Sequence, residues 1–210
     1  MPRHPRLIIP GAVYHVFNRG VKQLPIFHED RDRSYFLRLL CQTQQLFPFT
    51  LLSYTLMTNH YHFVLQTIDH SISRVMQYFS GQYGAWHNRA YRHIGHVFQG
   101  RYNAIWVAEE RYLMRVCRYV HLNPVKAGLV EKPGDYRWSN YLNLIEGRPD
   151  GLTDPRLLLD HFGTDIANQR SAYQQFVEED ISRTELITEK TLLKMRIWGD
   201  PPAWFRQKVR

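Results

Sequence analysis

The sequence predicts an α+β fold: a ferredoxin-like antiparallel sheet with helices on one face, followed by a helical C-terminal extension. Three observations lead to this class. Strand-like and helical hydrophobic patterns follow one another in the order β-α-β-β-α-β-α. Apolar residues make up 44% and charged residues 22% of the 210 residues, which excludes a disordered chain. No run approaches about 18 apolar residues, so no membrane-spanning helix is expected.

The first strand is expected at residues 12–18, where Val, Tyr and Phe favour the extended state. Arg19 and Gly20 end this strand. A helix is then expected over residues 29–47, because acidic side chains suit its first turn and apolar residues recur at helical spacing. Pro48 closes that helix.

Two strand-like runs, residues 49–57 and 60–66, are separated by Thr58 and Asn59 and predict a β-hairpin. A long helix is expected over residues 71–91. Ser71 can cap its first turn, and apolar residues recur every three or four positions.

The predicted core ends with a strand at residues 103–107 and a helix at residues 109–122, which Asn123 and Pro124 stop. The Gly- and Pro-rich stretch at residues 147–151 reads as a linker. We therefore expect a first domain at residues 1–147 and a helical extension at 148–210. Further helical segments are expected near 140–145, 155–162, 166–180 and 184–197.

Basic charge is concentrated in the first 130 residues. They hold fifteen Lys and Arg against six Asp and Glu, whereas residues 131–210 hold twelve against thirteen. Thirteen of those fifteen cations are Arg, the residue best suited to bidentate phosphate contacts and to stacking on bases. The pattern indicates either an ordinary solvated surface or a nucleic-acid footprint.

The chain has two cysteines, which excludes a disulfide scaffold and favours a reducing cytoplasm. No signal-peptide pattern follows Met1. We therefore expect a cytoplasmic protein.

His60 and His62 flank Tyr61 on a predicted strand. Successive strand side chains point to opposite faces, so the two imidazoles share a face and Tyr61 points to the other. Two imidazoles at this spacing can bind one metal ion. A pair of ordinary surface histidines is the alternative, since the chain has eleven histidines.

Tyr119 and Asn123 are four residues apart in a predicted helix and therefore lie on one helix face. A tyrosine hydroxyl can act as a covalent nucleophile, and an amide oxygen can bind a hard divalent cation. The alternative is that Tyr119 packs in the core and Asn123 caps the helix. Tyr112, seven residues earlier, lies near the same face and is a rival nucleophile.

Five stretches together resemble the single-tyrosine HUH transposases, and most of all the REP-associated tyrosine transposases of bacteria. They keep the order of that family over roughly residues 7–145. The stretches are residues 14–20, 25–27, 54–62, 97–102 and 118–130.

The resemblance implies that His60 and His62 hold a Mg²⁺ or Mn²⁺ ion, with Asn123 as the third, amide-type ligand. It implies that Tyr119 is the nucleophile. The implied reaction is cleavage of single-stranded DNA at the base of a hairpin, through a 5′-phosphotyrosine and a free 3′-OH. The implied protein is a cytoplasmic, nucleoid-associated monomer or homodimer. The candidate DNA-contacting residues are Arg3, Arg6, Arg19, Arg101, Tyr102, Arg111, Arg115, Arg118 and Lys126.

Two other functions are compatible with the sequence. One is a hairpin-binding regulator whose active site is unused, and the other is an unrelated metal-dependent hydrolase of small phosphate esters. The C-terminal extension could brace the core, shield the site or contact DNA through Lys194, Arg196, Arg206, Lys208 and Arg210.

Overall fold

The computed structural model describes residues 9–179 and 197–198. The strands are β1 (Val13–Arg19), β2 (Phe49–Leu56), β3 (His60–Thr67), β4 (Asn103–Val107) and β5 (Ile197–Trp198). The α-helices are α1 (Asp30–Leu46), α2 (Ile72–Tyr91), α3 (Glu110–Lys126), α4 (Tyr141–Glu146), α5 (Arg156–Leu159) and α6 (Ile166–Glu178).

The five strands form one sheet in the order β2-β3-β1-β4-β5. Neighbours among the first four strands are antiparallel, and β5 adds a two-residue parallel edge to β4. The helices α1 and α2 connect β1 to β2 and β3 to β4, as in the split βαβ arrangement. The predicted ferredoxin-like fold is therefore confirmed.

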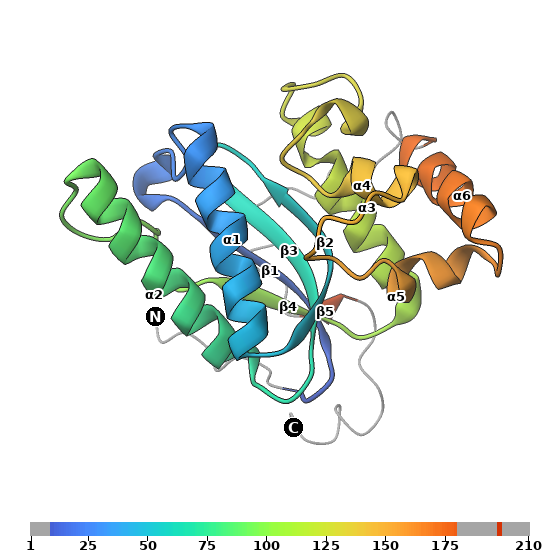
Figure 1. Cartoon of the computed structure of the whole chain (residues 1–210), viewed down its shortest axis with the longest axis horizontal. Coiled ribbons are helices and arrows are strands. Elements are labelled where there is room, and N and C mark those ends of the chain that lie inside the picture. Colours follow the sequence, from blue (N-terminus) through green and yellow to red (C-terminus); the bar gives the residue numbers. More distant parts are fainter. Residues whose placement is uncertain (1–8, 180–196, 199–210) are drawn as a thin grey trace.

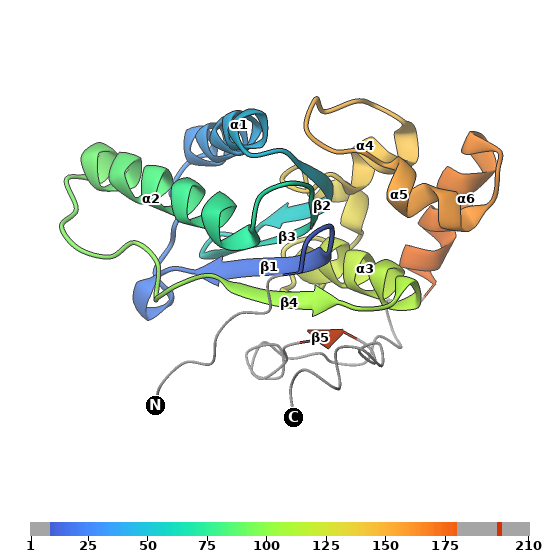
Figure 2. The same cartoon turned by 90° about the horizontal axis from the view of Figure 1, so that it is seen from below.

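The helices form two groups around the sheet (Figures 1 and 2). The pair α1 and α2 covers one face, as the predicted fold requires. The third helix, α3, packs on the opposite face together with α4 and α6. Two hydrophobic cores result, one on each side of the sheet.

Local signals explain where the first two helices begin. Glu29 and Asp32 form a capping box at the start of α1, in which Asp32 accepts hydrogen bonds from the backbone N–H groups of His28 and Glu29. The Ser71 hydroxyl accepts from the Arg74 backbone N–H at the start of α2. The predicted acidic helix start and the predicted Ser71 cap are both confirmed.

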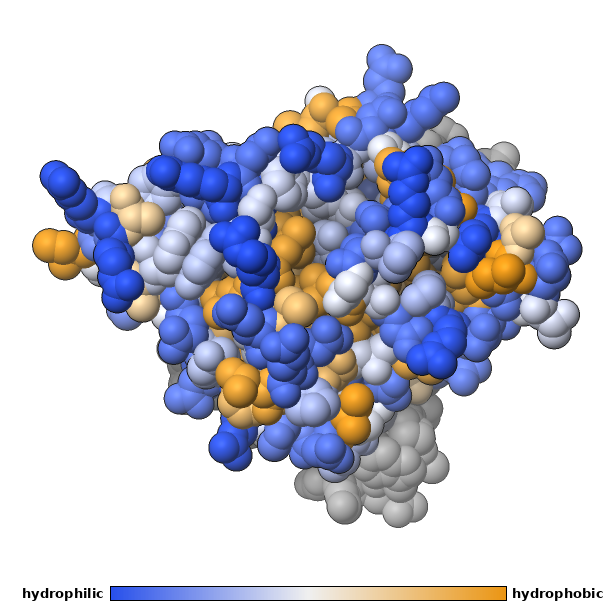
Figure 3. All heavy atoms as spheres, viewed as in Figure 1, coloured by the Kyte–Doolittle hydropathy of each residue, from blue (hydrophilic) through white to orange (hydrophobic). Residues whose placement is uncertain are grey.

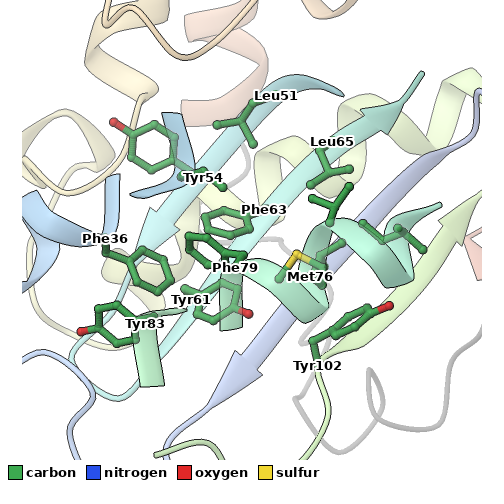
Figure 4. Close-up of a cluster of buried hydrophobic side chains, with 14 of the residues drawn as sticks. Phe36, Leu51, Tyr54, Tyr61, Phe63, Leu65, Met76, Phe79, Tyr83 and Tyr102 are labelled. Carbon is green, nitrogen blue, oxygen red and sulfur yellow. The ribbon is translucent and has the colours of Figure 1, made fainter. Parts of the chain in front are cut away.

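The first core lies between the sheet and the pair α1 and α2 (Figure 4). Phe36 of α1 is fully buried at its centre. Its ring lies 4.7 Å from those of Phe79 and Tyr83 and 5.0 Å from that of Tyr61, centroid to centroid. Aromatic pairs at these distances stabilise the fold by more than the apolar area that they bury.

Replacing Phe36 with Ala is expected to lower the free energy of unfolding by about 3–5 kcal/mol, because it removes a buried ring and leaves a cavity. Urea unfolding followed by circular dichroism measures the change. The exposed Ile94, replaced with Ala, is the control and is expected to change stability by less than about 0.5 kcal/mol. Equal losses for the two variants would contradict this description of the core.

The second core joins α3 to the segments that follow it. Val116 and Val120 of α3 are buried with Tyr173 and Val177 of α6. Residues on both sides of position 147 therefore contribute to one core. The helix expected at residues 184–197 lies outside the described residues, except that Ile197 belongs to β5.

The face seen in Figure 3 is dominated by hydrophilic residues, with apolar side chains in scattered groups between them. Within residues 9–179 and 197–198, none of the helices has the length and apolar character needed to cross a membrane.

Candidate active site

His60 and His62 lie on the face of β3 that carries the second core. Their ring centroids are 5.2 Å apart and the rings are perpendicular. Tyr61 points the other way and packs against Phe36 in the first core. The predicted sharing of one face by the two histidines is confirmed.

The turn before His60 is held by the end of β1. Gly20 follows Arg19, the residue paired with His60, and its N–H donates to the Asn59 carbonyl at 2.8 Å. A Cβ at position 20 would lie 2.1 Å from the Leu24 carbonyl oxygen, so only glycine fits there. The Asn59 side-chain oxygen in turn lies 2.7 Å from His60 Nδ1.

His15 of β1 fixes the orientation of His62. Its Nε2 lies 2.9 Å from His62 Nδ1, and both side chains are buried. The bond commits Nδ1 of His62 and leaves Nε2 as its available ligand atom. Sequence reasoning missed His15. The signal that could have found it is its place on the same strand face as Phe17, which pairs with His62 across the sheet.

The α3 helix brings Tyr119 against these histidines. Its ring is edge-on to His62 at 5.5 Å and to His15 at 5.7 Å, measured between ring centroids. The side chain is 6% exposed. The ammonium of Lys126 lies 4.9 Å from the centre of the Tyr119 ring.

Asn123 lies one helical turn after Tyr119. Its side-chain N–H donates to the Tyr119 carbonyl at 2.9 Å. The Asn123 side chain also lies beside His60, where it raises the pKa of that imidazole against the larger lowering by burial. The four residues of the predicted site, His60, His62, Tyr119 and Asn123, thus converge where β3 begins and α3 ends.

The prediction that Asn123 and Pro124 stop the helix is wrong, because α3 continues to Lys126. Proline has no N–H to donate to the carbonyl four residues earlier, which here belongs to Val120. The Thr55 hydroxyl of β2 donates to that carbonyl instead, at 2.8 Å. The side chain from the sheet satisfies the carbonyl that proline leaves open, and Asn123 stays on the helix.

Burial lowers the pKa of all three histidines below the ordinary value. The pKa of His15 falls to about 3 and that of His60 to about 4, in the latter case with a smaller contribution from the charge of Arg19. Burial also holds the pKa of His62 well below its usual range, and the neighbouring His15, His60 and Arg19 lower it further. All three imidazoles are therefore neutral at pH 7, the form that binds metal ions.

The donor set fits a divalent cation with mixed nitrogen and oxygen ligands. In the described part of the chain, no three side chains among His, Cys, Asp and Glu gather in a metal-binding cluster. Oxygen donors such as amide groups can complete the ligand set of a divalent cation held by two imidazoles. Asn123 beside His60 supplies an amide oxygen, which suits a hard cation.

Tyr112 is placed differently from Tyr119. Its ring packs at the edge of the second core, beneath the guanidinium groups of Arg111 at 5.2 Å and Arg115 at 5.6 Å. Its described ring and cation contacts include neither His60 nor His62. Tyr119, and not Tyr112, therefore lies against the histidine pair.

The predicted DNA-contacting arginines differ in exposure and in the groups that they contact. Arg101 is exposed before β4, and Arg111 is exposed with its guanidinium paired to Glu109 at 2.6 Å. Arg118 contacts α6 through Phe176, donating to its carbonyl at 3.2 Å. Two further candidates, Arg3 and Arg6, lie outside the described residues.

Tyr102, expected as a candidate for stacking on bases, is buried in the structure. The side chain is only 7% exposed and belongs to the first core, where its hydroxyl donates to the Ser73 hydroxyl at 3.2 Å (Figure 4). Neither face of a ring buried in this way is available to a base.

A split βαβ sheet that places two histidines of one strand beside a tyrosine of a helix is the arrangement that the resemblance to single-tyrosine transposases implies. The chain belongs to the family of IS200-like transposases, whose family model matches residues 9–123, more than half of the chain. The resemblance seen in the sequence is confirmed at the level of the family.

A solved structure shows the same fold. The chain is similar to the REP-associated tyrosine transposase bound to a REP hairpin, with a TM-score of 0.56, 17% identity, and coverage of 79% of this chain and 93% of that chain. A proposed transposase from Deinococcus radiodurans R1 gives a TM-score of 0.40 at 16% identity, covering 57% of this chain and 94% of that chain. The tRNA(His) guanylyltransferase from Saccharomyces cerevisiae gives a TM-score of 0.43 at 10% identity, covering 93% of this chain and 87% of that chain. A comparison with curated proteins gives no match.

Proposed function

We propose that the chain is a sequence-specific, single-stranded DNA endonuclease and strand transferase that acts at hairpins of repeated palindromic elements. One observation carries the proposal: the Tyr119 ring lies edge-on to His62, within the same site as His60 and Asn123. Membership of a transposase family supports the reaction class, and the REP hairpin in the similar solved structure supports the substrate.

In the proposed reaction the Tyr119 oxygen attacks the scissile phosphorus. The new bond is tyrosine oxygen to phosphorus, and the bond that breaks is phosphorus to the 3′-oxygen of the preceding nucleotide. The phenolic proton passes to solvent, and the departing 3′-oxygen gains one. A phenolate is a better leaving group than an alkoxide, so a 3′-OH can reverse the link or transfer the strand to new DNA.

His60, His62 and Asn123 are the residues that would hold a Mg²⁺ or Mn²⁺ ion. Bound there, the ion would supply Lewis-acid polarisation of the scissile phosphate. His15 keeps His62 in one orientation through the 2.9 Å bond to Nδ1. Lys126, placed over the Tyr119 ring, adds positive charge beside the developing phenolate.

Arginines near the site are proposed to bind phosphates of the strand. Arg19 ends β1 directly beside His60, and Arg115 is exposed on α3. Arg is suited to this role because its planar guanidinium donates two parallel hydrogen bonds to phosphate oxygens.

The proposed function is tested by incubating the full chain with a hairpin oligonucleotide that carries single-stranded flanks, with Mg²⁺ or Mn²⁺. Strand cleavage and an adduct that survives denaturing gel electrophoresis are expected, with the label retained on protein only when it lies 3′ of the cut. A duplex of the same sequence is the control and is expected to remain uncut.

One observation favours a second function, a hairpin-binding regulator with an unused site. Tyr119 is only 6% exposed, whereas a nucleophile must reach the DNA backbone. Tight binding of the hairpin with no adduct under either metal would support the regulator and would contradict the enzyme.

A further inference from the structure

A chain of buried hydrogen bonds joins α6 to the sheet through the back of the tyrosine helix. The Tyr173 hydroxyl of α6 lies 2.7 Å from His121 Nδ1, and His121 Nε2 lies 3.0 Å from the Asn140 side-chain oxygen. Asn140 donates to the Leu52 carbonyl at 3.1 Å and accepts from the Tyr54 N–H at 2.9 Å. All of these polar groups are buried.

The side-chain oxygen of Asn140 determines which atom is the donor in each hydrogen bond of this network. Since an amide oxygen only accepts, His121 donates from Nε2. Its Nδ1 is then an acceptor, and the Tyr173 hydroxyl donates to it. His121 thus has a partner on each nitrogen in one tautomer, and a network satisfied in this way specifies a single arrangement of the elements that it joins.

The hydrogen-bond network ends at a bulge in β2. The strand pairing shifts register between Leu51 and Ser53, so the Leu52 carbonyl accepts from Asn140. Bulges commonly redirect a strand in this manner beside functional sites.

His121 is placed to control the site although it does not enter it. It lies midway between Tyr119 and Asn123 in sequence. Two residues correspond to about 200° around a helix of 3.6 residues per turn, so His121 points away from the side of α3 that carries both site residues. A bond to His121 therefore fixes the rotation of α3, which is what aims Tyr119 at His62.

A second contact between α6 and α3 lies one residue before Tyr119. Arg118 donates from Nη1 to the Phe176 carbonyl at 3.2 Å, and its guanidinium stands 4.3 Å from the Phe176 ring centre. Together with the Tyr173 bond, α6 contacts α3 on either side of Tyr119 in sequence.

We propose that Tyr173 and His121 are positioning residues of the nuclease site, through which the helix α6 of the C-terminal extension sets the rotation of the tyrosine helix. The inference rests on the proposed function of Tyr119 as nucleophile. It assigns the extension a task in catalysis that the sequence left open between bracing the core, shielding the site and contacting DNA.

The test compares Tyr173→Phe with Tyr141→Phe. Both tyrosines are fully buried in the same core, and both rings lie within 5.9 Å of the His121 ring, centroid to centroid. The Tyr173 hydroxyl contacts α3, whereas the Tyr141 hydroxyl contacts Glu178 of α6 at 2.9 Å. Three quantities are measured in the full chain: the single-turnover rate of adduct formation, the Kd for the hairpin, and amide hydrogen exchange in α3.

Tyr173→Phe is expected to slow adduct formation about ten- to a hundredfold with Kd unchanged, because small displacements of a reacting group cost rates of that order. Faster amide exchange is expected around residues 119–123. Tyr141→Phe is expected to keep the wild-type rate. Equal rates for the two variants, with adducts formed by the wild type, would overturn the positioning role alone. Absence of adducts in the wild type would instead overturn the proposed function.

Discussion

Replacing Tyr119 with Phe is expected to abolish the covalent protein–DNA adduct while hairpin binding persists. Phenylalanine keeps the ring that packs edge-on to His62 and His15, so the second core stays filled. It removes the hydroxyl oxygen that is proposed to attack phosphorus. Denaturing gels measure the adduct, and fluorescence anisotropy measures the Kd, which is expected to stay close to the wild-type value.

Tyr112→Phe is the matched control for this experiment. Tyr112 lies on the same helix, beneath Arg111 and Arg115, and is the rival that the sequence leaves open. Its replacement is expected to leave the adduct yield close to that of the wild type. Undiminished adducts from Tyr119→Phe would contradict the proposed role of Tyr119. Loss of adducts from Tyr112→Phe alone would transfer the role of nucleophile to Tyr112.

Replacing His62 with Gln is expected to remove metal-dependent cleavage. Glutamine is similar in length, but it does not reproduce the pair of imidazole nitrogens that face His15 and the proposed ion. Loss of Lewis-acid stabilisation, worth several kcal/mol, slows cleavage by roughly a hundredfold or more. His60→Gln is expected to act in the same direction. The rate of strand cleavage as a function of Mg²⁺ concentration measures both effects.

Chelation of the metal with EDTA is expected to stop cleavage by the wild type, and added Mn²⁺ is expected to restore it. His96→Gln replaces an exposed histidine outside the site and serves as the control. Cleavage in EDTA equal to that in Mg²⁺, or equal rates for His62→Gln and His96→Gln, would contradict the proposed metal site.

Much of the fold could be predicted because its signals are local. The alternation at residues 60–66 and the helical spacing at residues 71–91 each match the observed element to within one residue at either end. The end of α3 could not be predicted in this way. Pro124 predicts a helix end because it has no backbone N–H to donate. The hydroxyl that donates to the Val120 carbonyl in its place belongs to Thr55, which is distant in sequence.

The candidate site could be predicted in part for the same reason. Strand alternation places His60 and His62 together, and helical spacing places Asn123 with Tyr119. The role of His15 depends on which strands pair, because it reaches His62 only when β1 lies beside β3. The burial of Tyr102 also depends on packing between distant segments, because its ring lies in the first core.

Mass spectrometry of the trapped adduct is the most direct test of the central claim. The full chain is reacted with a hairpin oligonucleotide, the DNA is digested to its last nucleotide, and the protein is cleaved into peptides. We predict that a single nucleotide is attached through a phosphodiester to Tyr119, on a peptide distinct from one carrying Tyr112. Attachment at any other residue, or cleaved DNA with no modified tyrosine, would contradict the claim that Tyr119 is the nucleophile.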